Sequence, residues 1–159
     1  MVSGADVRAV VGAVVDPELP ALTIEDLGVL RDVVVEADGR VVVTITPTYS
    51  GCPAVDAIRH DVEHALTEAG YTHFAVRTVL APAWTTNWMS DEGRRKLAEA
   101  GIAPPARVCP GSESASGTLR CPQCGSADTR LLNRFGSTAC KAMRACNRCL
   151  EPFDHFKSH

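Results

Sequence analysis

Four cysteines in the last third of the sequence have the spacing of metal ligands. They form two Cys-x-x-Cys pairs, Cys121 with Cys124 and Cys146 with Cys149, separated by 21 residues. Four thiolates at this spacing can close a tetrahedral site, and Zn²⁺ is its usual occupant. Gly125 follows the first pair directly and permits a tight turn that directs backbone N–H groups toward sulfur. The pattern predicts a four-cysteine zinc ribbon, with a rubredoxin-like iron site or a bound cluster as the alternative.

Another cysteine, Cys52, lies where a strand pattern gives way to a helix pattern. Pro53 suits a helix start, because its missing N–H would have no intrahelical partner there. A sulfur at this position would meet the unpaired N–H groups and partial positive charge of a helix N-terminus, which favour a thiolate over a thiol. We therefore expect Cys52 to be a reactive or metal-binding thiolate, accessible at the end of a sheet. The alternative is a buried, inert cysteine that fills a gap in the core.

The segment between the two cysteine pairs is basic. No acidic residue occurs in residues 129–149, and four basic residues lie between the pairs: Arg130, Arg134, Lys141 and Arg144. Such a surface suits an acidic protein or nucleic acid. Phe135 is the only aromatic residue between the pairs, so the sequence lacks a platform on which bases could stack. Docking of a protein is therefore favoured over nucleic acid, unless the basic residues form an ordinary solvated face.

The composition is that of a folded protein whose two regions differ in charge. The chain has 159 residues, of which 45% are hydrophobic and 22% charged, with a net charge of −3. Residues 1–105 carry 15 acidic and 8 basic side chains, whereas residues 106–159 carry 4 acidic and 8 basic ones. This asymmetry suggests two units with different partners.

The sequence gives no sign of export or membrane insertion. Its first residues, Met1-Val2-Ser3-Gly4, lack the basic and apolar regions of a signal peptide, and no apolar run approaches the roughly 20 residues of a membrane span. We expect a cytoplasmic protein with no membrane contact. In that reducing compartment the seven cysteines are better explained by metal ligation than by disulfides.

Hydrophobic periodicity predicts alternating helices and strands in the first hundred residues. Valines spaced as one helical face follow Ser3, namely Val7, Val10, Val11, Val14 and Val15. Strands over residues 29–36 and 41–46 flank an Asp38-Gly39 hairpin turn. A helix then runs from Pro53 toward Gly70, a third strand covers residues 74–80, and a short helix covers residues 91–100. This order predicts the α/β class, with helices packed on a small mixed sheet.

We expect this α/β domain over residues 1–105, a flexible linker over residues 106–118 and the zinc ribbon over residues 119–159. The linker region is rich in Gly and Ser. The ribbon is too short to bury a core of its own, so bound metal should supply its folding energy. Cys109 in the linker receives no role, and Cys140 is expected to be structural.

Several stretches of the sequence resemble known families. In the first domain they are Asp16-Pro17-Glu18-Leu19-Pro20, Ile24-x-Asp26-Leu27-Gly28-Val29, and Thr44-x-Thr46 leading to Gly51-Cys52-Pro53. They resemble the metal–sulfur cluster biosynthesis family, which includes SufT-like proteins. In the tail they are Gly136-Ser137-Thr138-Ala139-Cys140-Lys141-Ala142 and Cys146-x-x-Cys149-x-Glu151-Pro152-Phe153-x-x-Phe156-Lys157. They resemble the PaaD-type accessory proteins of phenylacetyl-CoA epoxidase gene clusters.

The resemblance implies a non-catalytic accessory protein. Such a protein would help mature an iron–sulfur or di-iron centre in a phenylacetyl-CoA oxygenase complex, with that complex and the iron–sulfur assembly machinery as its partners. The resemblance also implies that Asp16, Glu18 and Asp26 lie near Cys52. Soft sulfur together with carboxylate oxygens could hold Fe²⁺ or a cluster transiently.

Two other classes of protein remain open. An enzyme could use Cys52 as its nucleophile and His60 or His64 as its base. A helix that follows Cys52 would place those histidines two or three turns away, which argues against this arrangement. The chain could also be a zinc-ribbon adaptor that docks an acidic protein or nucleic acid, in which case binding to nucleic acid would depend on salt.

Overall fold

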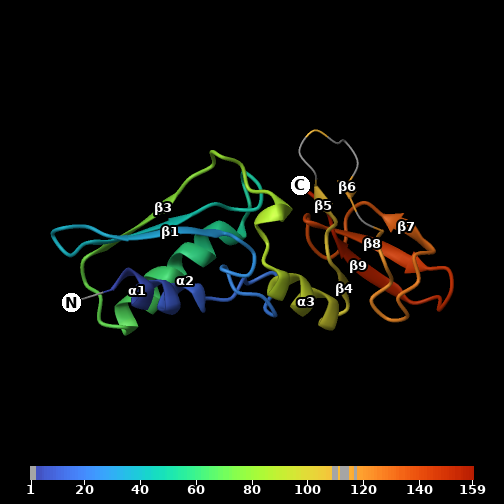
Figure 1. Cartoon of the computed structure of the whole chain (residues 1–159), viewed down its shortest axis with the longest axis horizontal. Coiled ribbons are helices and arrows are strands. Elements are labelled where there is room, and N and C mark those ends of the chain that lie inside the picture. The colour runs from blue at the N-terminus through green and yellow to red at the C-terminus, as the bar shows by residue number, and fades with distance from the viewer. Residues whose placement is uncertain (1–2, 109–110, 112–114, 117) are drawn as a thin grey trace. The chain divides into compact units, whose positions relative to one another are not determined.

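The chain divides into two compact units between Trp84 and Thr85. The computed structural model, shown in Figure 1, describes residues 3–108, 111, 115–116 and 118–159. The first unit is Met1–Trp84 and the second is Thr85–His159.

The first unit contains a three-stranded sheet with the strand order β1-β2-β3. Strand β1 (Leu30–Val35) pairs antiparallel with β2 (Val41–Ile45), and Gly39 allows the turn between them by adopting a φ of 82°. Strand β3 (Phe74–Thr78) pairs with β2 in parallel, as expected for two strands joined through a helix. The central strand β2 is almost wholly buried, because it has a neighbour on each side and a packed face.

Two helices lie on the same side of this sheet (Figure 1). Helix α1 (Gly4–Gly12) begins where the Ser3 hydroxyl accepts a hydrogen bond from the N–H of Ala5, as in an N-cap. Helix α2 (Ala54–Glu68) follows the Cys52 loop. Their buried residues form the core with the sheet: Val7, Val11, Ile58, Val62 and Leu66 from the helices, and Val41, Val43 and Ile45 from β2. The predicted α/β class, with helices packed on a small mixed sheet, is confirmed.

The second unit combines one α-helix with short strands. Helix α3 (Asp91–Glu99) is capped by Ser90, whose hydroxyl accepts from the N–H of Gly93. It follows the 3-10 helix η1 (Thr86–Trp88). A four-stranded sheet has the order β4-β9-β8-β7. Its strands are β4 (Ile102–Ala103), β7 (Thr129–Asn133), β8 (Lys141–Cys146) and β9 (Pro152–Phe156).

The division between the units differs from the predicted boundary at residue 105. Strand β4 pairs in parallel with β9 near the end of the chain. The Thr86 N–H and the Thr85 hydroxyl both donate to the carbonyl oxygen of His159, at 3.2 and 2.8 Å. These contacts join residues far apart in sequence, so residues 85–105 belong to the unit that holds the zinc ribbon. Trp84 instead belongs to the first unit, where its indole N–H donates to the buried carbonyl of Leu27 at 2.9 Å.

The predicted flexible linker is only partly described. Strand β5 (Arg107–Val108) pairs antiparallel with β6 (Ala115–Ser116), and the Asn87 side chain bonds both the N–H and the carbonyl of Val108. These described residues are paired rather than free. Cys109 lies outside the described residues. In the part of the chain that the structure describes, no helix has the length and apolarity to cross a membrane.

These contacts predict that the chain can be cut after Trp84. A fragment of residues 1–84 keeps the sheet, both helices and Trp84, so it should unfold in one cooperative thermal transition. A fragment of residues 1–102 should gain no stability over it, because residues 85–102 lose their partners in β9 and at His159. Calorimetry of the two fragments checks this. A molten 1–84 fragment, or a clearly higher melting temperature for 1–102, would show that the first unit extends beyond Trp84.

Candidate metal centre

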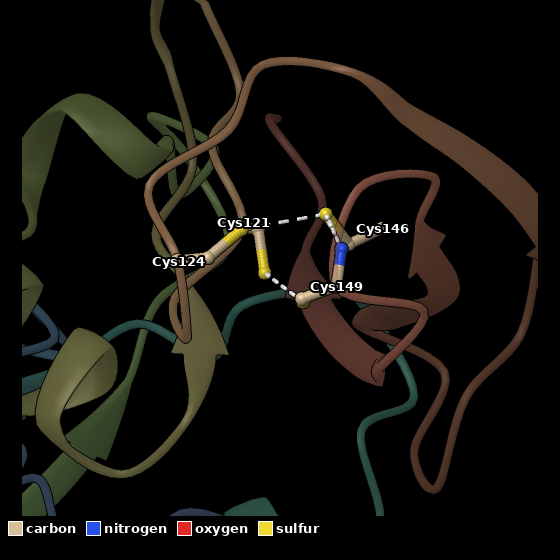
Figure 2. A group of neighbouring side chains, drawn as sticks. All are labelled: Cys121, Cys124, Cys146 and Cys149. Atoms are coloured by element: carbon tan, nitrogen blue, oxygen red, sulfur yellow. Dashed lines mark hydrogen bonds between the residues drawn. The ribbon is translucent and has the colours of Figure 1, made fainter.

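The four tail cysteines converge on one point. The sulfur atoms of Cys121 and Cys149 lie 3.7 Å apart, those of Cys124 and Cys146 lie 3.5 Å apart, and all four lie within 4.8 Å of one another. Figure 2 shows the two pairs facing each other from separate loops. A tetrahedron of sulfurs about 2.3 Å from a central Zn²⁺ has edges of about 3.8 Å. The cluster therefore fits a zinc ion.

The two Cys-x-x-Cys turns have the same backbone hydrogen bonds. In the first turn the N–H of Gly125 donates to the carbonyl of Cys121, and the N–H of Cys121 donates to the carbonyl of Ser126, both at 2.9 Å. In the second turn Leu150 donates to Cys146 at 3.1 Å, and Cys146 donates to Glu151 at 3.0 Å. Each turn places a residue with positive φ directly after its second cysteine: Gly125 at 74° and Leu150 at 67°.

Leu150 is a site residue that the sequence analysis missed. It takes the position that glycine occupies in the first turn, and the residue is 73% exposed, so little packing compensates the backbone conformation. The left-handed region costs about 1–2 kcal/mol for a residue with a Cβ. The sequence could have indicated this conformation, because Gly125 and Leu150 each directly follow a Cys-x-x-Cys pair.

Ionisation of the thiols is coupled within the cluster. The backbone N–H groups of Cys149 and Arg148 donate to the sulfur of Cys146 at 3.5 and 3.4 Å and lower the pKa of that thiol to about 6, against the opposing effect of burial. For Cys149 the N–H of Glu151 favours the thiolate, but burial and the neighbouring sulfurs outweigh it and raise the pKa to about 12. Four thiolates this close need a cation between them, which is the role a structural zinc ion would have.

A small core supports the cluster. Cys121 and Cys146 are buried with Ala103 and Phe153, and Leu119 packs against this group. Ala103 lies on β4 and Phe153 on β9, so the sheet reaches the cysteines directly. Cys140 lies apart from the four, buried, with its sulfur 3.0 Å from the hydroxyl of Thr138.

Cys52 lies directly before Pro53, which occupies the N-cap position of α2. The expectation that Cys52 is accessible is wrong, because the residue is only 7% exposed. The loop that precedes it, together with Leu80, Ala83 and Trp84, lines a cavity of about 190 Å³. Thr46 belongs to that lining, and its hydroxyl is buried without a hydrogen-bond partner in the described part of the chain.

The acidic residues of the first unit are engaged with the backbone. One oxygen of Asp16 accepts from the N–H groups of Glu18 and Leu19, at 2.8 and 2.9 Å. Asp26 accepts from the N–H of Thr23, whose hydroxyl in turn accepts from the N–H of Asp26, both at 3.1 Å. Both aspartates are buried, and Glu18 is half-buried. These bonds shape the loop between α1 and β1.

The structure does not gather Cys52, Asp16, Glu18 and Asp26 into one ligand set. Among the described residues, the four tail cysteines form the one group of three or more His, Cys, Asp or Glu side chains whose donor atoms converge. Any iron bound at Cys52 would therefore need ligands from a partner or a rearrangement of the loop.

Comparison with known proteins divides the chain in a similar way. Residues 4–77 match the family described as iron–sulfur cluster assembly protein, and residues 105–157 match the PaaD zinc beta ribbon domain. A solved domain of unknown function DUF59 from Bacillus anthracis has a TM-score of 0.55 and 32% identity, covering 59% of this chain and 90% of that one. A conserved hypothetical protein from Thermotoga maritima has a TM-score of 0.51 and 32% identity, covering 60% and 94%.

Two curated relatives extend these matches. An Escherichia coli K12 protein, named as the putative D component of 1,2-phenylacetyl-CoA epoxidase, is 45% identical over 153 residues, which are 96% of this chain and 91% of the relative. An Fe-S protein maturation auxiliary factor from Porphyromonas gingivalis is 36% identical over 93 residues, which are 58% of this chain and 88% of the relative.

The fold and the cysteine cluster thus define an iron–sulfur cluster assembly domain joined to a zinc ribbon. Among proteins of this class, the chain belongs to the PaaD family, as its zinc ribbon and its 45% identity to the Escherichia coli relative show. The resemblance inferred from the sequence motifs is confirmed.

The cluster predicts one zinc ion per chain. Replacing Cys121 with serine removes one of four sulfur donors, so elemental analysis of the purified Cys121→Ser protein should find almost no zinc. The ribbon should lose its dispersed amide signals in an NMR spectrum while the first unit keeps its own. Zinc retained at one per chain with an ordered ribbon would contradict this assignment.

The positive φ of Leu150 predicts that replacing this residue can stabilise the ribbon, whereas replacing Cys121 should unfold it. Leu150→Gly should retain zinc and stabilise the ribbon by about 1 kcal/mol, because glycine adopts positive φ without steric cost. Leu150→Val should destabilise it, since a β-branched side chain tolerates this conformation poorly. Chemical unfolding of the two zinc-loaded variants compares them directly. If the valine variant proved as stable as the glycine variant, Leu150 would not have the backbone conformation described.

Proposed function

We propose that this chain is an accessory maturation factor, which assists assembly or insertion of an iron–sulfur or di-iron centre in a phenylacetyl-CoA epoxidase complex. The observation that carries the proposal is the union of two parts in one chain: an iron–sulfur cluster assembly domain and a PaaD zinc ribbon. The relative over almost the whole chain is named as a component of that epoxidase, and a relative over the first part is named as an Fe-S maturation factor. The partners would be components of the oxygenase complex and the iron–sulfur assembly machinery.

Cys52 is the residue on which maturation depends in this proposal. It directly precedes the N-cap of the 15-residue helix α2. It is also a free cysteine outside the four-cysteine cluster. Iron or a cluster would be cargo at this sulfur, because thiolate is the soft ligand that iron–sulfur chemistry requires.

The burial of Cys52 adds a condition. With only 7% of the residue exposed, cargo could reach the sulfur only after the groups that cover it move. The loop before Cys52 lies against the cavity of about 190 Å³, which gives its side chains room to shift. Asp16 and Asp26 would contribute mainly by fixing the neighbouring backbone, and half-buried Glu18 could offer an oxygen to the cargo.

The zinc ribbon is structural in this proposal. Its four sulfurs face one another and would fully coordinate a Zn²⁺ ion, which leaves no open position for a substrate. The chain would act by presenting cargo and by binding its client, without catalysing the oxygenation.

The accessory role predicts that the purified chain does not turn over phenylacetyl-CoA. Its sequence lacks a Rossmann glycine fingerprint, a His-Glu-x-x-His zinc signature and the Glu-x-x-His pairs of a di-iron bundle. Incubation of zinc-loaded protein with the thioester, oxygen and an electron donor should return the substrate unchanged by mass spectrometry. Epoxidation or hydrolysis above a protein-free blank would refute the accessory role.

The proposed role of Cys52 predicts that the oxygenase complex loses iron when this cysteine is replaced. When the oxygenase components are produced together with the Cys52→Ser chain, the complex should assemble with several-fold less iron than with the unchanged chain. The matched control is Cys140→Ser, which alters another buried cysteine outside the zinc cluster and should leave the iron content of the complex normal.

Iron analysis and the visible spectrum of the purified oxygenase provide the measurement. Thermal unfolding of both serine variants shows whether each chain still folds, since serine preserves the size of the side chain but not its affinity for soft metals. A fully iron-loaded complex made with a folded Cys52→Ser chain would show that the thiol has no part in maturation.

A further inference from the structure

The segment of residues 130–135 is unusually exposed for part of a sheet. All six residues, Arg130, Leu131, Leu132, Asn133, Arg134 and Phe135, are exposed. Strand β7 contributes the first four, whereas its neighbour β8 buries four of its six residues. The sheet therefore leaves β7 uncovered on both faces. We call residues 130–135 the exposed segment.

Three large apolar side chains stand in this segment. Leu131 and Leu132 are each 48% exposed and Phe135 is 62% exposed. Met143, directly opposite Asn133 on β8, is a fourth exposed apolar residue beside them. Single exposed leucines are ordinary, but a group of neighbouring exposed apolar residues indicates a surface that another molecule covers.

The backbone of β7 is also open along one side. The sheet order is β4-β9-β8-β7, so β7 pairs with β8 and has no second neighbour among the described residues. The ladder between them shifts register between Leu131 and Asn133. An edge strand with apolar side chains is a ready template for another strand, and such edges are usually protected. Here the edge is protected mainly by charge.

That charge is entirely positive. Arg130 and Arg134 flank the leucines, and neither forms an ion pair within the described part of the chain; Arg130 donates instead to the amide oxygen of Asn147 at 2.6 Å. Arg144 lies opposite Leu131 on β8 and donates weakly to the Thr129 hydroxyl.

Several arginines elsewhere in the chain have carboxylate partners. Arg8 pairs with Glu25 at 2.7 Å and Arg59 with Glu63 at 3.1 Å, and Arg95 pairs with both Glu92 and Glu99. The exposed segment instead offers cations and apolar side chains with no acid from residue 129 to residue 149.

We propose that the exposed segment is a docking site for an extended, acidic and apolar segment of a partner protein, which adds a strand to the open edge of β7. The partner's backbone would pair with β7, its apolar side chains would cover Leu131 and Leu132, and its carboxylates would pair with Arg130 and Arg134. Strand addition obtains affinity from the backbone and selectivity from alternate side chains. Complementary charge would speed the encounter and reject basic segments.

The surface suits a protein better than a nucleic acid. Phosphates would pair with the arginines but would leave Leu131 and Leu132 exposed to water. Base stacking needs free aromatic faces, and the one aromatic ring of the segment, Phe135, has the ammonium group of Lys157 4.5 Å from its centre. Lys157 is held there by a 3.1 Å hydrogen bond to the carbonyl of Arg134.

This inference deepens the proposed function, because it names the chemistry by which the ribbon would hold a client. It does not depend on Cys52, which lies in the other unit. The docking experiment can therefore fail while Cys52 still supports maturation. Docking can equally succeed while the Cys52→Ser chain supports full maturation, so the two proposals fail separately.

The test uses the full zinc-loaded chain and three probes. The first is a synthetic seven-residue peptide of alternating glutamate and valine, the second replaces glutamate with lysine, and the third is a short single-stranded oligouridine. The acidic peptide should shift the NMR signals of residues 129–135 and slow hydrogen exchange at β7 amides that face away from β8. The lysine peptide should do neither, and the oligouridine should not displace the acidic peptide.

Variants then separate side-chain contacts from general charge. Leu131→Thr with Leu132→Thr, and separately Arg130→Gln with Arg134→Gln, should each weaken binding of the acidic peptide by about tenfold, a loss typical of truncated interface contacts. Val34→Thr and Arg59→Gln are matched controls from the first unit, since Val34 is 45% exposed on the edge strand β1 and Arg59 is exposed on α2. Both controls should leave binding unchanged, and zinc analysis should show one ion per chain in every variant.

The proposal is overturned by any of three results. These are no binding of the acidic peptide, binding that persists in both double variants, and signal shifts that lie outside residues 129–135. Tighter binding of the oligouridine at the same residues would identify the segment as a nucleic-acid surface instead.

Discussion

Four sulfur atoms within 4.8 Å of one another determine the arrangement of the second unit. Such a group cannot ionise fully without a cation, and the opposite pKa changes at Cys146 and Cys149 express that competition. A central zinc ion would resolve it and would join the two cysteine loops. The matching hydrogen bonds of the two turns show that the backbone is shaped for this purpose at both ends. The short sheet and its small core then extend outward from the cysteines.

The first unit is organised by a different constraint, the burial of apolar side chains between two helices and a sheet. Its central strand is buried, and the loop before β1 is fixed by aspartates that accept backbone hydrogen bonds. This packing also covers Cys52. Such burial protects the thiol from unwanted oxidation and from free metal ions.

The two units therefore combine opposite properties in one chain. The acidic part carries the assembly domain with its sheltered cysteine, and the basic part offers an uncovered strand. The proposed maturation role would need both a place for cargo and a surface that selects its client. The zinc ribbon can present such a surface because its metal, rather than an extensive core, would stabilise it. Strand β7 therefore does not have to be buried in a core.

The sequence by itself determined the local features of this protein. Periodicity predicted the existence of α1, α2 and the three strands of the first unit, because each element repeats apolar residues at its own spacing. It extended the first helix too far, since α1 ends at Gly12, before Val14 and Val15. The hairpin at Gly39 and the two Cys-x-x-Cys turns were also readable, since turn chemistry acts over a few residues. The convergence of the cysteines followed from the demands of a tetrahedral metal rather than from any knowledge of the fold.

Only the tertiary structure decided the features that join distant residues. The division between the units falls after Trp84 because β4 pairs in parallel with β9 and because Thr85 and Thr86 contact His159. No local pattern in the sequence encodes these contacts. The burial of Cys52 likewise depends on elements that pack around it, whereas the sequence could indicate only its place before a helix. Long-range pairing and burial are sums over many contacts, so neither can be read from one stretch of sequence.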